Sequence, residues 1–205
     1  HVPPAKLKLV YLAADPVYRR INTKSTLLKA RNKYSLPEKF VLYVGDINYN
    51  KNIPSLIAAC QKANTPLVIV GKQAKEIANE DLSHPELSHL RNVDFSTVHR
   101  LGFVSDEDLV CIYNLASVYC QPSLSEGFGI PVLEALACGT PVACSNAGSL
   151  PEIAGDQATY FDPLNIEAIA KAISGTRTRV PSPNPPRFSW DKTAKETLMV
   201  YAEVL

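Results

Sequence analysis

The sequence predicts an α/β domain: a parallel sheet covered by helices on both faces. Apolar runs of strand length alternate along the chain with stretches of helical spacing. The apolar runs are nearly continuous, as in strands that are buried on both faces of a sheet, instead of alternating with polar residues. The chain has 205 residues, of which 46% are hydrophobic and 20% charged, a composition typical of a globular domain with a substantial core.

Strands are expected wherever a short apolar run ends at a turn residue. The runs FVLYVG and PLVIVG both end in glycine, at Gly45 and Gly71, and the first follows Pro37. SVYCQPS leads from an apolar run directly into a loop. The expected strands lie within residues 7–13, 40–45, 66–71, 98–104, 117–123, 141–145 and 158–163.

Helices are expected between these runs. Ser105 can cap a helix whose first turn holds Asp and Glu, and Gly139 can end another. In residues 53–63, Ile53, Leu56, Ile57 and Cys60 fall on one helical face. The expected helices cover residues 53–63, 105–116, 131–138 and 165–174, with one or two short helices within 74–93.

The far end of the chain looks separate from this alternation. PSPNPP carries four prolines in six residues, so it cannot form regular helix or central strand. We therefore predict one domain over residues 1–180, a linker over 181–188, and a helix over 189–205. Ser189 is the expected cap of that helix, and Phe188 with Trp190 is expected to anchor it by burial.

Charge and cysteine content exclude several classes of function. Twenty-one Lys and Arg balance twenty Asp and Glu, so the chain lacks the basic excess of a nucleic-acid-binding protein. Its five cysteines lack the paired spacing of a zinc site, and we expect buried thiols in a reducing compartment. No run reaches the roughly 20 apolar residues of a membrane-spanning helix, and a cytoplasmic location is expected.

The most informative stretch is EGFGIPVLE, from Glu126 to Glu134. Gly127 and Gly129 permit unusual backbone angles and close approach of a ligand. Pro131 fits the first turn of a helix, where the unpaired amides and the helix dipole attract an anion such as a diphosphate. The two glutamates bracket this point, and carboxylates accept strong hydrogen bonds from sugar hydroxyls.

The same stretch carries a resemblance. SEGFGIPVLEALACGTPV resembles the E-x7-E signature of the retaining glycosyltransferases of family 4, which have the GT-B fold. FVLYVGDINYNKNIPSLIAA, LGFVSDEDLVCIYNLASVYC and AGSLPEIAGDQATYFDP resemble further segments of that family, so the similarity covers nearly the whole chain. It implies the C-terminal half of a GT-B fold, a Rossmann-like sheet that binds a nucleotide-diphosphate sugar.

The resemblance implies roles for particular residues. Glu126 would contact the donor sugar near the reacting centre, and Glu134 would bind the ribose hydroxyls. Lys51 would neutralise the diphosphate, which makes Glu126 and Lys51 the expected catalytic residues. The other residues expected to bind the donor, many through backbone groups, are Gly45, Gly71, Phe103, Val104, Gly127, Phe128, Gly129, Ile130 and Val132.

One departure from the family concerns the basic residues. Many members carry an Arg beside the lysine, at the places where this sequence has Asp46 or Asn50. Positive charge stabilises the leaving diphosphate, so its loss is expected to weaken diphosphate binding. Lys72, directly after Gly71, is a candidate to compensate.

The expected reaction is transfer of a hexose from a UDP- or GDP-linked donor to a glycan or lipid-linked acceptor, with retention and with neither metal nor cofactor. Its acceptor site would lie in an N-terminal domain that this sequence lacks, and that domain could bring peripheral contact with the inner membrane face. Two alternatives stay open: a stand-alone nucleotide-sugar-binding module that acts with a partner chain, and a GT-B-type nucleotide-sugar epimerase. A dinucleotide-dependent oxidoreductase is disfavoured, because no G-x-G-x-x-G follows any expected strand.

Overall fold

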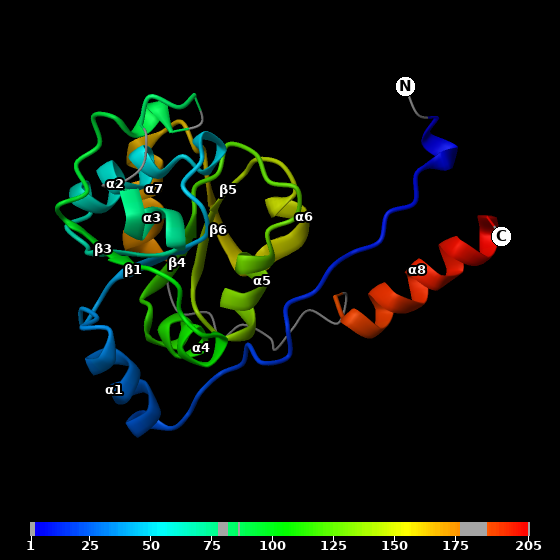
Figure 1. The fold of residues 1–205 in the computed structure, drawn as a ribbon, viewed down its shortest axis with the longest axis horizontal. Helices are drawn as coiled ribbons and strands as arrows, with labels where there is room; N and C mark the ends of the chain where they lie inside the picture. The colour runs from blue at the N-terminus through cyan, green and yellow to red at the C-terminus, as the bar shows by residue number, and fades with distance from the viewer. Residues whose placement is uncertain (1–2, 78–81, 86, 177–187, 205) are drawn as a thin grey trace.

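The protein is built around one parallel sheet, as predicted (Figure 1). The computed structural model describes residues 3–77, 82–85, 87–176 and 188–204. Six strands, hydrogen-bonded in the order β3-β2-β1-β4-β5-β6, form the sheet. They are β1 (Val41–Val44), β2 (Leu67–Val70), β3 (Val98–Leu101), β4 (Val118–Gln121), β5 (Val142–Ser145) and β6 (Ala158–Phe161).

The strand order reverses direction at the centre of the sheet. From β1 the chain proceeds outward through β2 to β3, and it then returns to place β4 on the other side of β1. Val41 is in register with Leu67 of β2 on one side and with Val118 of β4 on the other. In open parallel sheets, ligands bind outside the carboxyl ends of the strands at such a reversal. The loops that follow β1 and β4 therefore mark the expected binding edge.

Helices cover both faces of the sheet. One core contains residues of α2, α3 and α7, and the other contains residues of α4, α5 and α6, with α1 packed against α4 (Figure 1). The helices are α1 (Lys24–Lys33), α2 (Ile53–Lys62), α3 (Lys72–Glu76), α4 (Asp106–Leu115), α5 (Ile130–Ala137), α6 (Leu150–Ala154), α7 (Ile166–Gly175) and α8 (Trp190–Val204).

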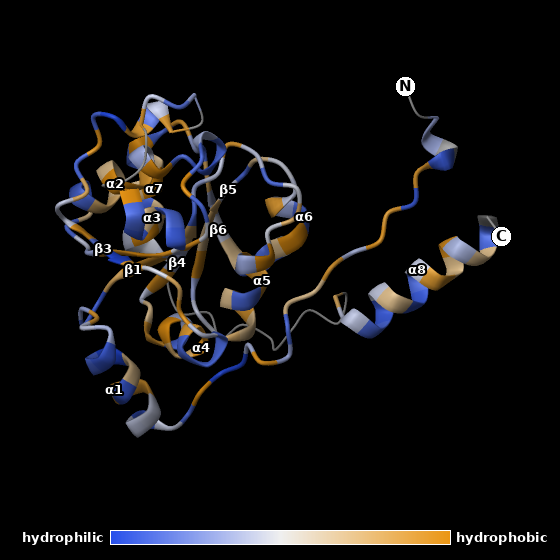
Figure 2. Ribbon diagram, in the orientation of Figure 1, coloured by the Kyte–Doolittle hydropathy of each residue, from blue (hydrophilic) through white to orange (hydrophobic). Residues whose placement is uncertain are grey.

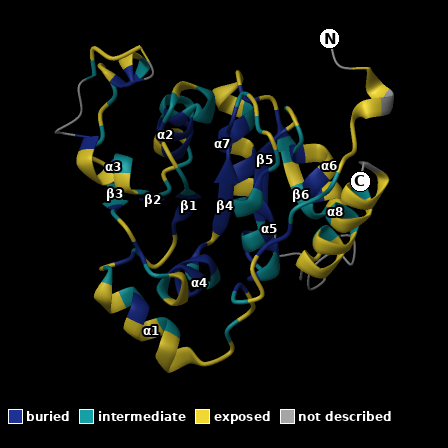
Figure 3. Cartoon of the chain, turned by 45° about the vertical axis from the view of Figure 1, so that its right-hand side comes forward, coloured by how far each residue is buried: buried dark blue, intermediate teal, exposed yellow. Residues whose placement is uncertain are grey.

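Successive strand residues belong to opposite cores, which explains the continuous apolar runs. Leu42 and Tyr119 lie in one core, whereas Val41 and Tyr43 lie in the other. The hydrophobic strands run through the middle of the molecule in Figure 2, and Figure 3 shows them as its most buried part. Both faces of the sheet are removed from water, so both sets of side chains must be apolar.

Most of the expected strands and helices are confirmed, within one to three residues at their ends. The capping predictions also hold: the amide of Asp108 donates to Ser105 Oγ at 3.4 Å, and Gly139 has a φ of 76° just beyond α5. Part of the predicted stretch 74–93 lies outside the described residues, but α3 and a short 3-10 turn at Ser88–Leu90 are present there.

The strand expected at residues 7–13 is wrong. This segment is extended but pairs with no described strand, and Leu7 and Leu9 are exposed. It runs alongside α8 to one side of the sheet in Figures 1 and 3. An apolar run becomes a strand only where it pairs with another strand, and this segment joins neither edge of the sheet, which ends at β3 and β6.

Two helices escaped prediction because their sequences lack a clear helical pattern. In α1 only Ala30 is buried, so its sequence KSTLLKARNK is mostly polar all round. The helix is held by tertiary contacts: Lys33 forms an ion pair with Asp108 at 2.5 Å, and Tyr34 donates to the same carboxylate at 2.8 Å. The other, α6, has five residues, which is too short for a periodicity to show.

The last helix begins as predicted but is anchored differently. The amide of Lys192 donates to Ser189 Oγ at 3.2 Å, which confirms the cap. Phe188 is buried against Tyr11 and Phe128, whereas Trp190 is 43% exposed, so burial of Trp190 is a wrong prediction. The hydroxyl of Thr193 donates to the carbonyl oxygen of Tyr11 at 2.5 Å, which ties the helix to the N-terminal segment.

The predictions for the linker, for membrane-spanning segments and for the cysteines can be compared with the described residues. Of the linker predicted at 181–188, residues 181–187 lie outside the described residues. Within the described part of the chain, no helix is long and apolar enough to span a bilayer. All five cysteines are buried and unpaired, as expected, and burial raises the pKa of the Cys60, Cys138 and Cys144 thiols to about 12.

Candidate functional site

The candidate site lies where the strand order reverses. The loop after β1 contains Lys51, and the loop after β4 contains Glu126. Because β1 and β4 are hydrogen-bonded neighbours, their loops leave the same edge of the sheet side by side. The structure therefore brings together two residues that lie 75 positions apart in the sequence.

Lys51 and Glu126 form a bidentate contact at this edge. Lys51 Nζ lies 2.8 Å from Glu126 Oε1 and 3.0 Å from Oε2. The lysine side chain is 22% exposed and the glutamate side chain 11% exposed. A pair so far removed from water is less screened than a surface pair, and removal of one partner would leave the other charge poorly compensated.

Two neutral side chains support the same carboxylate from inside the protein. Gln121 Nε2 donates to Glu126 Oε1 at 2.8 Å, and Ser123 Oγ donates to the same oxygen at 2.7 Å. Gln121 is in turn oriented by Tyr119, whose hydroxyl donates to Gln121 Oε1. Gln121, Ser123 and Tyr119 are all buried. Glu126 is thus fixed by charge from one side and by a buried hydrogen-bond network from the other.

The second glutamate of the motif is held in a different way. Glu134 lies on α5, half-buried, and its Oε2 accepts a 2.8 Å hydrogen bond from the hydroxyl of Tyr113 on α4. Burial raises the pKa of Glu134, and the carboxylates of Asp106 and Asp15 add to the increase. The Tyr113 hydrogen bond acts against that increase because it stabilises the ionised form.

Two buried tyrosine rings lie between the carboxylates. The rings of Tyr113 and Tyr119 pack with centroids 5.7 Å apart. Burial raises the pKa of Tyr119 well above its ordinary value, and the nearby charges of Glu134 and Glu126 add to the increase. Both glutamates of the motif are therefore connected to one buried aromatic cluster, Glu134 directly through Tyr113 and Glu126 through Gln121 and Tyr119.

The backbone between the glutamates turns sharply into α5. Gly129 has a φ of 106°, in the region that favours glycine, and the helix begins at Ile130 with Pro131 in its first turn. A Cβ on Gly129 would lie 2.8 Å from a Leu150 methyl group. Gly127 does not use the predicted conformational freedom: its φ lies outside the left-handed region that favours glycine, and a Cβ there would meet no protein atom within 4 Å.

A third loop fixes the backbone of Glu126. Ser149 Oγ donates to the carbonyl oxygens of Glu126 and Phe128 at 3.1 and 2.8 Å. Gly148 has a φ of 60°, and a Cβ on it would lie 2.9 Å from both the amide nitrogen and the carbonyl oxygen of Glu126. The loop after β5 thus packs directly against the glutamate.

The lysine loop is tied to its neighbours by asparagine side chains. Asn52, in the left-handed conformation, donates to the carbonyls of Pro122 and Pro163 at 3.1 and 2.8 Å. The side-chain amide of Asn50 donates to the Ser125 carbonyl at 3.3 Å, and the backbone carbonyl of Asn50 accepts from the amide of Leu124 at 2.8 Å. Asn50, which stands where many relatives of the resembled family have Arg, therefore joins the two loops of the site.

Two of the predicted glycines form the adjoining rim. Gly45, with a φ of 141°, follows β1, and Gly71 follows β2. A Cβ on Gly71 would lie 2.4 Å from the Gly45 carbonyl oxygen, so the two strand ends approach closely because Gly71 has no side chain. Asp46 and Lys72 are both exposed just beyond these glycines.

The other predicted residues differ in exposure. Phe103 is 88% exposed beyond β3, whereas Val104 is buried in the core. Phe128 is half-buried and packs toward the N-terminal segment, with its ring 6.4 Å from that of Tyr11. The Val132 side chain is buried, and its amide donates to the Gly129 carbonyl at 3.0 Å, inside the helix turn.

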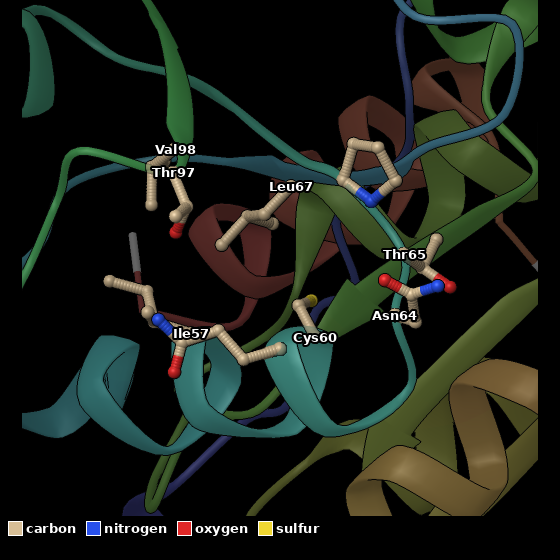
Figure 4. Close-up of a pocket in the computed structure, with 9 residues that line it drawn as sticks. Ile57, Cys60, Asn64, Thr65, Leu67, Thr97 and Val98 are labelled. Carbon is tan, nitrogen blue, oxygen red and sulfur yellow. The ribbon is translucent and has the colours of Figure 1, made fainter.

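Two hollows of the molecule lie at the opposite edge of the sheet. Figure 4 shows one of about 350 Å³ between α2 and the starts of β2 and β3, lined by Ile57, Cys60, Leu67 and Val98 among others. Another, of about 800 Å³, is lined by Arg20, Lys24 and Pro141 among others. Neither touches Lys51, Glu126 or Glu134. Among the described residues, no group of three His, Cys, Asp or Glu could hold a metal ion.

The sequence indicated both carboxylates and the lysine but missed their supports. In the sequence, Gln121 looks like the end of a strand and Ser123 like a loop residue. Tyr113 looks like an apolar residue of a helix. One signal was available: Gln121 is a polar residue at the end of an apolar strand, where a buried amide requires a partner.

Comparison with known proteins gives a consistent result. The family model described as "Glycosyl transferases group 1" matches residues 26–176. O-antigen chain mannosyltransferase B of Escherichia coli is 33% identical over 85% of this chain and 49% of that protein. An uncharacterised glycosyltransferase of Methanocaldococcus jannaschii is 33% identical over 98% of this chain and 55% of that protein. The chain spans about half the length of these relatives.

Solved structures share the fold. Sucrose-phosphate synthase from Thermosynechococcus elongatus superposes with a TM-score of 0.71 at 26% identity, over 96% of this chain and 52% of that one. The Anabaena HepE protein, solved in complex with UDP and glucose, superposes with a TM-score of 0.70 at 20% identity, over 96% of this chain and 56% of that one.

Proposed function

The chain belongs to the glycosyl transferases group 1 family, and from that premise we propose that it forms the donor-binding domain of a retaining glycosyltransferase. In this proposal the domain binds a nucleotide-diphosphate sugar at the carboxyl edge of its sheet. The whole enzyme transfers the hexose to a glycan or lipid-linked acceptor. Neither metal nor cofactor takes part, and an N-terminal domain supplies the acceptor site.

The observation that carries the proposal is the arrangement of charges around the start of α5. Lys51 supplies a cation at the strand reversal, and the first turn of α5 adds the positive end of a helix dipole. Glu134 accepts from Tyr113, and Glu126 is linked through Gln121 to Tyr119, whose ring packs against that of Tyr113. Cationic groups suit a diphosphate, and carboxylates suit the hydroxyls on either side of it.

Each group then has a distinct role. Lys51 and the amides of the Phe128–Ile130 turn stabilise negative charge on the diphosphate as it leaves the sugar. Glu126 accepts hydrogen bonds from the donor sugar, and Glu134 accepts them from the ribose. The exposed rim at Gly71 and Phe103 takes the nucleobase through backbone groups.

Lys51 must change partners in this role. In the structure both carboxylate oxygens of Glu126 lie within 3.0 Å of its ammonium group. A diphosphate brings more negative charge than one carboxylate, so it competes for the same cation. The missing Arg makes this competition harder, since Asp46 and Asn50 add no positive charge.

The relatives narrow the choice of sugar and pathway. Several are named mannosyltransferases, and one acts on an O-antigen chain by its name. The HepE structures with UDP and with UDP-glucose share this fold. GDP-mannose and UDP-glucose are therefore the first donors to test, and polysaccharide synthesis is the proposed setting. A cytoplasmic location, with peripheral contact at the inner membrane face through the second domain, completes the proposal.

Calorimetry on this chain tests donor binding. We expect saturable heat with GDP-mannose or UDP-glucose and weaker heat with the matching nucleoside diphosphate. Absence of heat with every nucleotide and nucleotide sugar at millimolar concentration would contradict the proposal. Glu134→Ala should weaken the nucleoside diphosphate, whereas Glu126→Ala should remove the extra affinity that the sugar provides. The opposite pattern would show that the two roles are exchanged.

A further inference from the structure

The carboxylate of Glu126 is asymmetric in its contacts. Oε1 receives three donors, from Lys51, Gln121 and Ser123, at 2.7 to 2.8 Å. Among the hydrogen bonds of the described residues, Oε2 receives Lys51 alone, at 3.0 Å. Oε1 is therefore nearly saturated, and Oε2 keeps most of the capacity to accept a hydrogen bond from a ligand.

Two of the three donors to Oε1 are fixed by the protein interior. Gln121 is 3% exposed and Ser123 is fully buried. Gln121 Nε2 also donates to Ser123 Oγ at 2.8 Å, so the serine hydroxyl accepts from the amide and donates to the glutamate. Tyr119 donates to the amide oxygen of Gln121, which fixes the amide with its NH2 group toward Glu126. In this series of hydrogen bonds from Tyr119 to Glu126, each donor and each acceptor is fixed by the chemistry of its partner.

From this geometry we infer that Gln121 and Ser123 are positioning residues, which hold Glu126 with Oε2 toward the donor sugar when Lys51 turns to the diphosphate. The inference rests on the proposed function and deepens it. Without these two donors, a carboxylate released by Lys51 would be free to rotate or to follow the ammonium group. With them, one oxygen stays fixed while the other is offered to a hydroxyl.

The first experiment removes Lys51 and asks whether Glu126 stays in place. A crystal structure of the Lys51→Met chain needs no ligand, so its outcome is independent of the proposed function. We expect Glu126 Oε1 to remain within hydrogen-bond distance of Gln121 Nε2 and Ser123 Oγ. A carboxylate that has turned out to solvent would overturn the inference, because the buried network would then not suffice to hold it.

The second experiment separates positioning from a general structural role. Gln121→Met keeps the size of the side chain but removes the donor, and Ser123→Ala removes the hydroxyl. For each variant, calorimetry compares a nucleotide sugar with its nucleoside diphosphate, using GDP-mannose with GDP and UDP-glucose with UDP. We expect the nucleotide sugar to bind about tenfold more weakly, as for the loss of one hydrogen bond to a charged group, and the nucleoside diphosphate to bind within about twofold of wild type.

Parallel weakening of both ligands, or no change in either, would refute positioning. If wild type binds neither nucleotide sugar, the proposed function fails with this arm, while the Lys51→Met structure still decides where Glu126 lies. Gln121→Glu sharpens the result, because it keeps the acceptor for Tyr119 but places a second carboxylate against Glu126. We expect it to lose more sugar-dependent affinity than Gln121→Met.

Thr140→Val is the matched control. Thr140 is also buried, and its hydroxyl donates to the Tyr113 carbonyl at 2.7 Å, just before β5 at the opposite edge of the sheet. It loses one buried hydroxyl hydrogen bond, as Ser123→Ala does, so it reports the general cost of such a loss. We expect lower thermal stability with an unchanged ratio of sugar to nucleoside diphosphate affinity.

Discussion

Glu126 and Glu134 belong to one motif, yet the protein holds them by opposite means. Glu126 contacts an ammonium group and two buried neutral donors, and a neighbouring loop fixes its backbone. Glu134 accepts from a tyrosine hydroxyl and lies near further carboxylates, so burial raises its pKa. The first carboxylate is paired with a cation, whereas burial of the second makes its ionised form costly in folding free energy. Two glutamates of one sequence motif can therefore have different electrostatic environments.

The largest expected effect comes from removal of the cation at Glu126. Lys51→Met should weaken binding of a nucleoside diphosphate by roughly 10- to 100-fold, because a hydrogen bond to a charged group contributes about 1.5–3 kcal/mol. Calorimetry measures this loss. Lys62→Met is the control, since Lys62 at the end of α2 forms an exposed ion pair with Glu167 of α7. Equal losses in both variants would mean that Lys51 acts only through general charge.

The backbone of Glu126 offers a test of similar size. Gly148→Ala places a Cβ 2.9 Å from the Glu126 backbone at a φ of 60°, so we expect it to lower the free energy of unfolding by about 1–3 kcal/mol. Gly127→Ala is the matched control, because its Cβ would meet nothing within 4 Å. It should change stability by less than about 0.5 kcal/mol. Chemical denaturation measures both, and similar values would disprove close packing of the loop after β5 on Glu126.

On the Glu134 side, Tyr113→Phe removes a single donor. The half-buried carboxylate of Glu134 then loses its hydrogen bond from Tyr113, and we expect about 1–2 kcal/mol of lost stability and several-fold weaker nucleoside diphosphate binding. Tyr34→Phe serves as the comparison, because its hydroxyl also donates to a carboxylate, that of Asp108, at 2.8 Å. It should lose stability without loss of affinity. An equal loss of affinity in both variants would show that Tyr113 has no particular link to the site.

The smallest expected effect distinguishes the two glutamates by sign. The raised pKa of Glu134 means that the folded state holds its proton to higher pH than the unfolded state does. Stability therefore falls as the pH rises from the ordinary Glu value through the raised one. Glu134→Gln keeps an acceptor for Tyr113 and removes the charge, so it should be more stable than wild type above that window and equal to it below. Denaturation across pH 4 to 8 measures the difference.

The matched variant Glu126→Gln gives the opposite expectation near neutral pH. It leaves Lys51 beside a neutral amide in a poorly hydrated place, so it should be less stable than wild type at pH 7. If both variants were stabilised, the two carboxylates would not differ in how the fold compensates their charge. If both were destabilised, Glu134 would contribute more to the fold than its environment indicates.

Sequence prediction succeeded for elements whose sequence pattern is local and missed those that depend on distant partners. Strands β1, β2 and β4 and helices α2 and α4 were predicted because each carries its own period, cap or glycine. The segment 7–13 has the same apolar character but lacks a partner strand, and a sequence does not state its partners. The prediction missed α1 for the converse reason, because its contacts are with another helix, where Asp108 lies.

The site followed the same division. The sequence indicated Lys51, Glu126 and Glu134, and it indicated the turn at Gly129 through residue type. It did not indicate that Lys51 would contact Glu126, that Gln121 and Ser123 would hold the same oxygen, or that Asn50 would join the two loops. These contacts depend on side-chain direction and on neighbouring loops, which no local pattern contains.

By itself, then, the sequence determined the fold class, the family and the residues of the motif, because hydrophobic period, helix caps and glycines act over a few residues. Only the tertiary structure decided the electrostatic state of each carboxylate. Desolvation and charge pairing depend on atoms from strands and loops that are distant in the chain, as Lys51 is from Glu126. The strand reversal between β1 and β4 brings those atoms within 3 Å, and the difference between the two glutamates arises there.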